Sequence, residues 1–480
     1  MEIKGILRHF ATIGVGTLLN MALGFLATVL ITRIVNPGHY GELSIFKMYG
    51  SLAGSILWLG LDQALVRYYY ISDARSYKSS LLRFCTRWPL FITMLVSILI
   101  ITVTSIQTVD IIYSPLQWIA LAIYTMGIIF SRFSTIVLRL ECKTKEYSWC
   151  NVSQQIVYIL LSLLLLYFYK NNEVVVLIIA TIIGQFSVAF FSMLVGKEYW
   201  LGENCTLTAY NVSKKELVQY AWPFIITTSV ATFFQSIDRI SLNYFCDYNE
   251  VGVYSSALVL VNVFALLQST FNTLWTPLSV EHYTKNPEDT AFYKQAQEFI
   301  TVLMFAFGMT VILFKEIFVI LLGHGYREAA YLIPFLAFHP IMYTISEVTV
   351  GGLVFKKKSK IQIVVSVVPC VVNLIGNMAL IPIYGGRGAA ISTGIAYITF
   401  FVMRTLLSNR YYYVDYSLMR FSILSVSSIL YAVYATFHAI DIMSVFLYIC
   451  VLTIMLFLYR DSVKIMIRYG IGILKKNNLC

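Results

Sequence analysis

The chain has 480 residues, of which 59% are hydrophobic and 12% are charged. Soluble domains carry about 25% charged residues, so this composition excludes a soluble globular protein and indicates a polytopic membrane protein. The net charge of +11 could suit nucleic-acid binding, but its distribution along the chain, described below, argues against that function.

Apolar segments of about twenty residues, the length that a helix needs to cross a bilayer, recur along the whole sequence. We predict fourteen of them. The first should remain as a span, because it is too long for a signal-peptide core and lacks a small-residue cleavage site. The predicted spans are residues 12–33, 43–62, 86–107, 115–138, 151–169, 174–196, 221–243, 252–275, 297–321, 331–352, 361–382, 388–407, 418–438 and 442–459. The connections between them leave no room for a soluble catalytic domain.

Lysine and arginine are distributed unequally between the two sides of these spans. The N-terminus, every second connection and the C-terminus, taken with the flanking helix ends, hold 27 of the 35 Lys and Arg residues. The remaining connections hold four, and four lie within spans. Cytoplasmic loops carry the excess of positive charge, so this pattern predicts that both termini are cytoplasmic.

Cysteine and glycine patterns give no sign of a cofactor. The eight cysteines are scattered, with no CxxC pair and no Cys/His cluster at the spacing of metal ligands. No phosphate-binding glycine loop is present, which excludes direct ATP hydrolysis. We therefore expect no metal, no cofactor and no enzymatic activity, and any uphill transport would need an ion gradient.

Two predicted helices of the first half carry charge within the bilayer. Lys47 and Asp62 lie along one face of the second helix, and Arg67 follows it. Arg132 lies on the fourth helix, about 10 Å inside its cytoplasmic edge. A charge at mid-membrane costs roughly 2.5–3.5 kcal/mol on insertion scales, so such residues usually face a hydrated cavity in the protein. The alternative is that these long side chains snorkel to the interfaces.

The predicted span 221–243 is polar along one side. Gln235 and Arg239 share that face with several Ser and Thr residues, and Asp238 precedes Arg239 directly. Asn262 lies on a polar face of the next helix. These residues predict a helix face that lines a hydrated cavity within the protein. The alternative is that they make small polar contacts between neighbouring helices, which are common in membrane bundles.

The second half repeats the organisation of the first. A short outer turn opens the second helix at Tyr40–Gly41–Glu42 and again, 211 residues later, at Val251–Gly252–Val253. A basic turn follows the fourth helix at Lys143 and again, 215 residues later, at Lys358. Parallel repeats of this kind are a recurrent transporter plan, with the substrate between the lobes. The expected organisation is an N-terminal lobe at 1–215, a C-terminal lobe at 216–410, and two peripheral helices with a basic cytoplasmic tail at 411–480.

The second half contains one further embedded carboxylate, Glu347, in the tenth predicted helix. A buried carboxylate needs a partner or a proton. His339 lies on the same helix beside Pro340, where freed backbone carbonyls more often satisfy the imidazole. Asp62, Asp238 and Glu347 are therefore the candidates for binding a coupling H⁺ or Na⁺.

Several short motifs resemble one family of membrane proteins. They include Gly351–Gly352–Leu353, the basic run at 356–360, Asn373 to Asn377, Leu380 to Gly385, Gly388–Ala389–Ala390, residues 235–254, and Gly60–Leu61–Asp62 with Arg67–Tyr68. Together, in this order and spacing, they resemble the polysaccharide-exporter branch of the multidrug/oligosaccharidyl-lipid/polysaccharide superfamily. The Pro–Tyr–Gly turn between the eleventh and twelfth helices has no clear counterpart at Lys170–Asn171–Asn172, so the two lobes are expected to differ there.

The resemblance implies an O-antigen-type flippase of the bacterial inner membrane. Such a protein moves an undecaprenyl-diphosphate-linked oligosaccharide, for O-antigen, capsule or exopolysaccharide, between two lobes that open alternately around a charged cavity. Its partners would be that glycan lipid, membrane lipids, a coupling ion, and the polymerase and chain-length machinery. Arginine suits phosphate because its planar fork donates two hydrogen bonds at once. The expected substrate contacts are Arg67, Arg132, Arg239, Lys47, Gln235 and Asn262.

Two other functions stay open at this point. A multidrug exporter of the same superfamily would need carboxylates for cationic substrates, whereas the embedded charges here are mostly basic. A membrane polymerase or glycosyltransferase would be expected to expose a large outer loop with acid and base residues, and the predicted outer loops are short.

Overall fold

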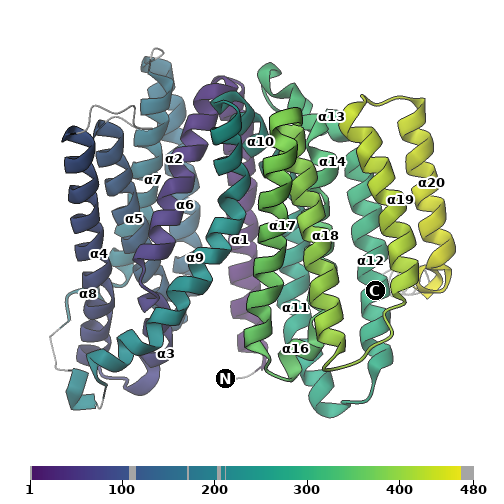
Figure 1. Ribbon diagram of the computed structural model, residues 1–480. Helices are drawn as coiled ribbons and strands as arrows, with labels where there is room; N and C mark the ends of the chain where they lie inside the picture. Colours follow the sequence, from purple (N-terminus) through teal and green to yellow (C-terminus); the bar gives the residue numbers. More distant parts are fainter. Residues whose placement is uncertain (1–2, 107–114, 170–171, 203–206, 211, 466–480) are drawn as a thin grey trace, which may run out of the picture. The chain divides into compact units, whose positions relative to one another are not determined.

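The structure is a computed structural model that describes residues 3–106, 115–169, 172–202, 207–210 and 212–465. Within these ranges the chain is helical and contains no strand (Figure 1). The far end of the predicted basic tail, residues 466–480, lies outside the described residues. The described chain therefore has the all-α architecture that the apolar segments predict.

The chain divides into two compact units, Met1–Ile237 and Asp238–Cys480. The division falls inside α9 (Lys214–Phe245), so one continuous helix contributes to both units. The predicted boundary between the two lobes at residue 215 stays a prediction.

Unit 1 is built around α5, which packs against α2, α4 and α7, while α6 packs between α1 and α7. Its elements are α1 (Ile3–Thr32), α2 (Pro37–Leu57), α3 (Leu61–Tyr68), η1 (Tyr69–Ile71), α4 (Arg75–Ile106), α5 (Pro115–Leu140), α6 (Thr144–Phe168), α7 (Glu173–Val195), α8 (Lys197–Trp200), η2 (Leu207–Tyr210) and the first part of α9.

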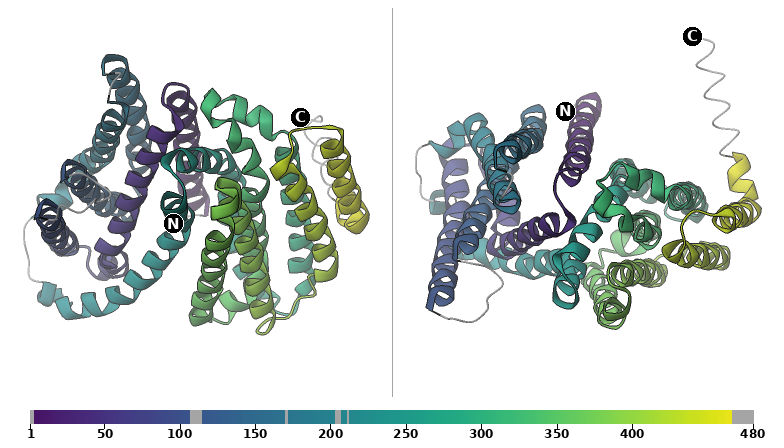
Figure 2. Two further views of the ribbon diagram at one scale, coloured as in Figure 1. Left: turned by 45° about the horizontal axis from the view of Figure 1, so that its top comes forward. Right: turned by 90° about the horizontal axis from the view of Figure 1, so that it is seen from above.

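Unit 2 is built around α18, which packs against α17, α15, α14 and α10. Its elements are α10 (Tyr248–Val261), α11 (Phe264–Lys285), α12 (Thr290–Leu313), α13 (Lys315–Ile320), η3 (His324–Tyr331), α14 (Ile333–Leu336), α15 (Phe338–Thr349), α16 (Gly351–Phe355), α17 (Ser359–Tyr384), α18 (Gly386–Asn409), α19 (Leu418–Phe437) and α20 (Ile442–Leu458). Figure 2 shows α19 and α20 side by side at the edge of this unit, as expected for peripheral helices.

Ten helices in the described residues are long and apolar enough to cross a membrane, and a bent pair, η3 with α14 and α15, makes an eleventh. The shorter helix α20 is also apolar. Four predicted spans are not single helices: 43–62, 252–275, 297–321 and 331–352 are each interrupted. The prediction of fourteen spans therefore stays a prediction, although each predicted span overlaps helices in the described part of the chain.

The break between α2 and α3 has a clear physical cause. Leu59 and Gly60 both have positive φ angles, of 54° and 65°, which ends the helical hydrogen-bond ladder. A Cβ atom on Gly60 would lie 2.1 Å from the carbonyl oxygen of Ala221, so only glycine lets α3 approach α9 this closely. The break re-aims the next residues and places Asp62 in the interior of unit 1.

Two hydrogen bonds to one carboxylate fasten one end of unit 1. Lys78 on α4 donates to Glu141, just after α5, at 2.9 Å, and Tyr69 donates to the same carboxylate at 2.7 Å. Burial opposes the charged form of Glu141, but these hydrogen bonds outweigh it and hold the pKa of Glu141 below its usual value. The charged form therefore fastens α4 to α5 at this end.

The ends of unit 2 are fastened by charged side chains as well. Lys315, fully buried, donates to the carbonyl oxygens of Ala435 and His438, where α19 ends. Glu316 accepts a hydrogen bond from the backbone of Ile440 at 2.9 Å. These contacts satisfy carbonyl groups that a helix end leaves without partners, so Lys315 has a structural role within its predicted span.

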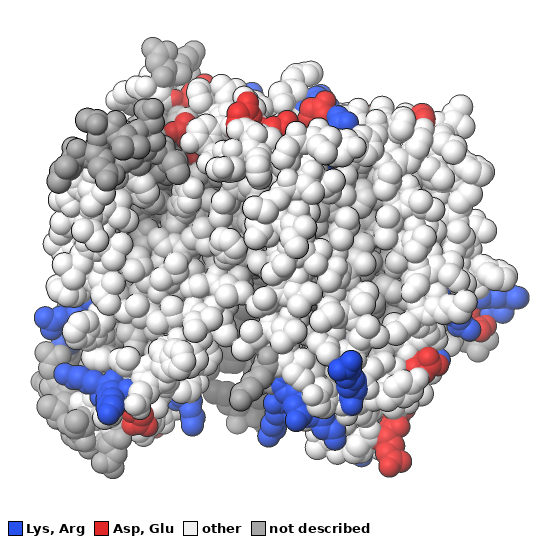
Figure 3. All heavy atoms as spheres, viewed as in Figure 1, with Lys and Arg blue, Asp and Glu red and all other residues white. Residues whose placement is uncertain are grey.

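Charge is segregated along the helices of each unit. Figure 3 shows Lys and Arg side chains gathered towards one end of the helices and most Asp and Glu side chains towards the other on the face displayed. The acidic end of unit 2 includes Asp247, which caps α10 by accepting from the backbone of Glu250 at 3.0 Å. That hydrogen bond lowers the pKa of Asp247. The segregation agrees with the unequal distribution of cations in the sequence.

Candidate functional site

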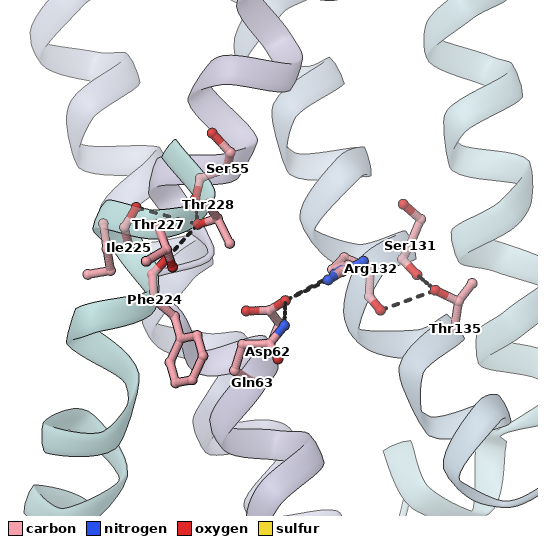
Figure 4. A network of polar contacts seen from close by, with 10 residues as sticks. All are labelled: Ser55, Asp62, Gln63, Ser131, Arg132, Thr135, Phe224, Ile225, Thr227 and Thr228. Atoms are coloured by element: carbon pink, nitrogen blue, oxygen red, sulfur yellow. Dashed lines mark hydrogen bonds and ion pairs between the residues drawn. The ribbon is translucent and has the colours of Figure 1, made fainter. Parts of the chain in front are cut away.

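Asp62 and Arg132 form an ion pair in the interior of unit 1. Asp62 Oδ2 accepts from Arg132 Nη2 at 2.7 Å and from Arg132 Nε at 3.2 Å, while Gln63 donates to the same oxygen at 3.0 Å (Figure 4). The guanidinium also lies over the ring of Trp58, with 4.6 Å between its central carbon and the ring centroid. The fork of Arg132 is thus held by a carboxylate and an aromatic face from the α2–α3 segment.

The two partners differ in how far they are exposed. The Asp62 side chain is 1% exposed, whereas the Arg132 side chain is 34% exposed. Asp62 Oδ1 is buried and accepts no hydrogen bond within the described residues. An arginine that is neutralised on one side and open on the other can offer its remaining N–H groups to an incoming anion.

Lys47 and Arg67, the other predicted cations of unit 1, lie apart from this pair. The Lys47 ammonium sits over the ring of Tyr158 on α6, 4.1 Å from the centroid. Arg67 is exposed and lines a polar hollow with Gln63, Tyr70 and Tyr220. Gln63 therefore links the hollow around Arg67 to the carboxylate that pairs with Arg132.

Asp238 is the centre of a buried polar cluster in unit 2. Tyr254 and Thr393 each donate to Asp238 Oδ2 at 2.7 Å. Asn373 and Asn377 donate to Oδ1 at 3.0 and 2.9 Å. The donors come from α10, α17 and α18, so one carboxylate joins three helices to the end of α9. All four of these hydrogen bonds come from neutral groups.

The chemistry of this cluster suits a small cation or a proton. It offers a carboxylate, two amides and two hydroxyls, and oxygen ligands of this kind are those that hard cations prefer. Asn377 Oδ1 is buried and accepts no hydrogen bond in the part of the chain that the structure describes. An amide can present either its nitrogen or its oxygen to Asp238, because a half-turn about its terminal bond exchanges the two atoms. The amides and hydroxyls of the cluster can therefore donate hydrogen bonds to Asp238 or provide oxygen ligands to a cation bound there.

Glu347 has a partner that the sequence did not suggest. Arg404 on α18 donates to Glu347 Oε1 at 2.7 Å and to the hydroxyl of Ser346 at 2.8 Å. The Arg404 guanidinium also lies over the ring of Phe400, 5.3 Å from the centroid. Both charged side chains are largely buried, with 10% of Arg404 and 16% of Glu347 exposed. Unit 2 thus contains an intramembrane ion pair, as unit 1 does.

The remaining predicted site residues lie on α9 and at the end of α10. Gln235, in unit 1, is exposed. Arg239, in unit 2, is partly exposed beside Asp238. Asn262 is exposed at the end of α10, where its backbone N–H donates to the carbonyl of Leu258 at 2.8 Å. Their substrate contacts stay predictions.

A sequence profile described as "Polysaccharide biosynthesis protein" matches residues 6–282. This chain belongs to the polysaccharide biosynthesis protein family. A curated relative, an uncharacterized membrane protein of Methanocaldococcus jannaschii, is 24% identical over 200 residues. That match covers 41% of this chain and 39% of the relative, so the chain spans about two fifths of the relative's length.

Solved transporter structures share the fold of this polysaccharide biosynthesis protein. The lipid II flippase MurJ in an inward closed conformation matches with a TM-score of 0.67 and 14% identity, over 96% of this chain and 99% of that one. An inward-facing multidrug resistance transporter of the MATE family matches with a TM-score of 0.61 and 16% identity, over 82% and 94%. A transporter of Pyrococcus furiosus from the MOP superfamily gives 0.55 and 14%, over 84% and 95%. These likenesses confirm the fold class that the apolar segments and the motifs indicated.

Sequence reasoning missed five residues that surround the two carboxylates of unit 2. Arg404 lies near the end of a predicted span, and Tyr254 directly follows the Val251–Gly252–Val253 turn, so neither position indicated a partner for a buried carboxylate. Asn373 and Asn377 are spaced by four residues in an apolar helix, which puts both amides on one face. That spacing, with Thr393 on the next helix, was an available signal for a polar partner of Asp238.

Replacing Arg404 by alanine is expected to lower the stability of this protein strongly. The substitution leaves Glu347 buried without its counter-ion, which typically costs about 3–5 kcal/mol. Arg410 lies one residue beyond α18, is exposed, and serves as the matched control, so Arg410→Ala should melt close to the wild type. Thermal unfolding of the purified variants gives the comparison. Equal melting temperatures for Arg404→Ala and Arg410→Ala would contradict the structural importance of this pair.

Proposed function

We propose that this protein is a flippase that moves an undecaprenyl-diphosphate-linked oligosaccharide across the bacterial plasma membrane by alternating access. The family match and the transporter fold support the coarser function, transport in polysaccharide biosynthesis. A diphosphate-linked glycan is too polar to cross hydrocarbon alone, so the protein must replace its water with polar groups. Transport of this kind needs no catalytic residue.

The observation that carries the proposal is the placement of Arg132. Its guanidinium is neutralised by a fully buried carboxylate and remains one-third exposed. A guanidinium that is neutralised by a carboxylate and still partly exposed can bind phosphate. Its N–H groups can donate to a phosphate oxygen in place of the carboxylate oxygen, so the arginine is never an unpaired charge in hydrocarbon. Arg67, Lys47 and Arg239 would provide further positive charge along the route, with Gln235 and Asn262 as contacts for the sugars.

Ion coupling would depend chiefly on Asp238. Of the three candidate carboxylates, Asp62 and Glu347 each pair with an arginine, so binding a cation there would first require breaking an ion pair. Asp238 is instead surrounded by neutral donors that can rearrange around H⁺ or Na⁺. We propose Asp238 as the primary coupling residue, with Asp62 and Glu347 linked to it through the arginines that they hold.

The glycan would belong to an O-antigen, a capsule or an exopolysaccharide, handed on to a polysaccharide polymerase and its chain-length machinery. A multidrug cation antiporter is the alternative within the superfamily. Arg132 and Arg404 each pair with one buried carboxylate, so neither pair has a net negative charge that would attract an organic cation. The description of the matching family also favours polysaccharide over drugs.

Both termini are proposed to lie in the cytoplasm, which a labelling experiment checks. A single cysteine at Asn249, exposed at the acidic end of unit 2, should react with an impermeant thiol reagent added to intact cells. A cysteine at Lys356, exposed in the basic turn after α16, should react only after the membrane is opened. Both are made in a background from which the native cysteines are removed. Labelling of position 356 in intact cells would reverse the topology.

Deletion of the gene tests the function itself. In the deletion strain we expect undecaprenyl-diphosphate oligosaccharide to accumulate on the cytoplasmic side and surface glycan to disappear. A plasmid copy of the gene should remove the accumulated lipid and restore the surface glycan. Mass spectrometry of the extracted lipid intermediates identifies the glycan at the same time. Normal surface glycan, with no lipid-linked intermediate accumulating, would exclude the flippase function in that cell.

A further inference from the structure

Two hollows of opposite character share their walls at the basic end of unit 1. One is polar and is lined by Arg67, Gln63, Tyr70 and Tyr220. The other is an apolar groove of about 590 Å³, lined by residues of α4 and by the starts of α3 and α9. Residues of α3 and α9 line both, so these two helices form the partition between them.

The apolar groove is open and has cations at its margin. Trp88 on α4 and Trp222 and Val218 on α9 line the groove, and each is about half exposed. Lys214 and Lys215, the first residues of α9, belong to the same lining. Tryptophan and lysine together are typical of the membrane interface, where an apolar chain meets a charged headgroup.

The partition between the two hollows is held firmly. Gly60 packs against the Ala221 carbonyl so closely that no side chain would fit between them. Tyr68 donates to Glu216 at 3.1 Å, and its ring meets that of Tyr220 edge-on, with 5.8 Å between centroids. Because α3 cannot slide along α9 without breaking these contacts, the groove and the polar hollow keep fixed positions relative to each other.

We propose that this groove binds the polyprenyl chain of the lipid-linked substrate at the start of transport. The proposal rests on the function proposed above. The diphosphate would lie against Lys214 and Lys215 at the margin, and the sugars would extend into the polar hollow, where Tyr70 and Tyr220 offer ring faces. From there Gln63 leads to the pair of Asp62 and Arg132.

The neighbouring polar hollow distinguishes this occupant from an ordinary phospholipid. An anionic phospholipid would fill the groove and satisfy the two lysines, but its small headgroup would leave the surface around Arg67 unused. A long apolar chain joined through a diphosphate to several sugars uses the groove, the cationic margin and the hollow together. An amphiphile of that build matches all three features of the surface.

Photocrosslinking tests the assignment. The full-length protein, with p-benzoylphenylalanine in place of Trp222, is irradiated in vesicles that contain radiolabelled undecaprenyl diphosphate. The matched control carries the same group in place of Leu160, an exposed leucine of α6 in the same unit. We expect at least tenfold more label at position 222. Unlabelled undecaprenyl diphosphate should displace it, and an equal mole fraction of phosphatidylglycerol should not.

Two variants sharpen the test. Val218→Trp narrows the groove, and the double variant Lys214→Ala/Lys215→Ala removes its cations; each should lower labelling at position 222 at least fivefold. Equal labelling at positions 222 and 160, or equal displacement by phosphatidylglycerol, would overturn the proposal and leave an ordinary lipid contact. If that happened while the wild type still restored surface glycan to a deletion strain, the groove assignment would fail and the flippase function would stand.

Discussion

Replacing Arg132 by lysine is expected to remove most surface glycan while leaving the protein folded in the membrane. Lysine keeps the positive charge that pairs with Asp62, but it cannot donate two parallel hydrogen bonds from a planar fork. Losing one hydrogen bond to a charged group costs about 1.5–3 kcal/mol. At about 1.4 kcal/mol for each tenfold change, transport should fall by roughly ten- to a hundredfold. Surface glycan restored to a deletion strain, normalised to protein in the membrane, measures the effect.

The same helix provides the control for this experiment. Arg139 lies seven residues further along α5 and is exposed, so Arg139→Lys should support wild-type export. The double variant Asp62→Asn/Arg132→Gln replaces the ion pair by neutral groups and should recover much of the stability lost in Arg132→Ala, without recovering export. Wild-type glycan from a well-expressed Arg132→Lys would show that the fork of Arg132 does not bind the substrate.

Replacing Asp238 by asparagine is expected to abolish the dependence of transport on an ion gradient. The amide keeps the shape of the carboxylate and can still accept hydrogen bonds from Tyr254 and Thr393, but it carries no charge to bind H⁺ or Na⁺. Net uphill movement should fall at least about tenfold, which corresponds to a loss of about 1.4 kcal/mol or more. Transport is measured in vesicles with an imposed proton or sodium gradient.

The control is an exposed carboxylate of the same unit, and Asp461→Asn should transport as the wild type does. Asn377→Leu provides an independent comparison, because it removes an amide next to Asp238 while leaving its charge. It should weaken coupling less than Asp238→Asn if the carboxylate itself binds the ion. Full gradient dependence in Asp238→Asn would exclude Asp238 as the coupling residue.

The helical architecture could be predicted from the sequence because its causes are local. Apolar length defines a span, and the bias of cations between loops defines the sides. Interruptions within spans could not be predicted in the same way. The turn at Gly60 depends on its contact with Ala221, which lies far along the chain, and hydropathy carries no trace of that contact.

The site could be predicted only in part. The positions of Asp62, Arg132, Asp238 and Glu347 followed from the cost of embedding charge in hydrocarbon, which makes each of them conspicuous. Their partners are set by tertiary packing. Arg132 and Glu347 each precede a basic turn, at Lys143 and Lys358, by eleven residues, so corresponding places in the two halves carry opposite charges.

The ion pairs of Arg132 and Glu347 show why the sequence alone could not predict the partner of each buried charge. The arginine of unit 1 takes a carboxylate from α3, whereas the carboxylate of unit 2 takes its arginine from α18. A repeat in the helices therefore does not imply a repeat in the contacts. The sequence places Arg404 near the end of a predicted span, and only the structure shows that it pairs with Glu347.

Flipping by the purified protein in vesicles tests the proposed function most directly. Vesicles are prepared with a fluorescent undecaprenyl-diphosphate oligosaccharide in both leaflets, and an impermeant quencher is added outside. With the wild type, quenching of the glycan lipid should proceed beyond the outer-leaflet fraction. With Arg132→Lys it should stop at that fraction, and the inner-leaflet fraction of a fluorescent phosphatidylcholine should stay protected with either protein. A wild-type protein that leaves the inner-leaflet glycan lipid unquenched, in vesicles where its incorporation is verified, would contradict the function proposed for this chain.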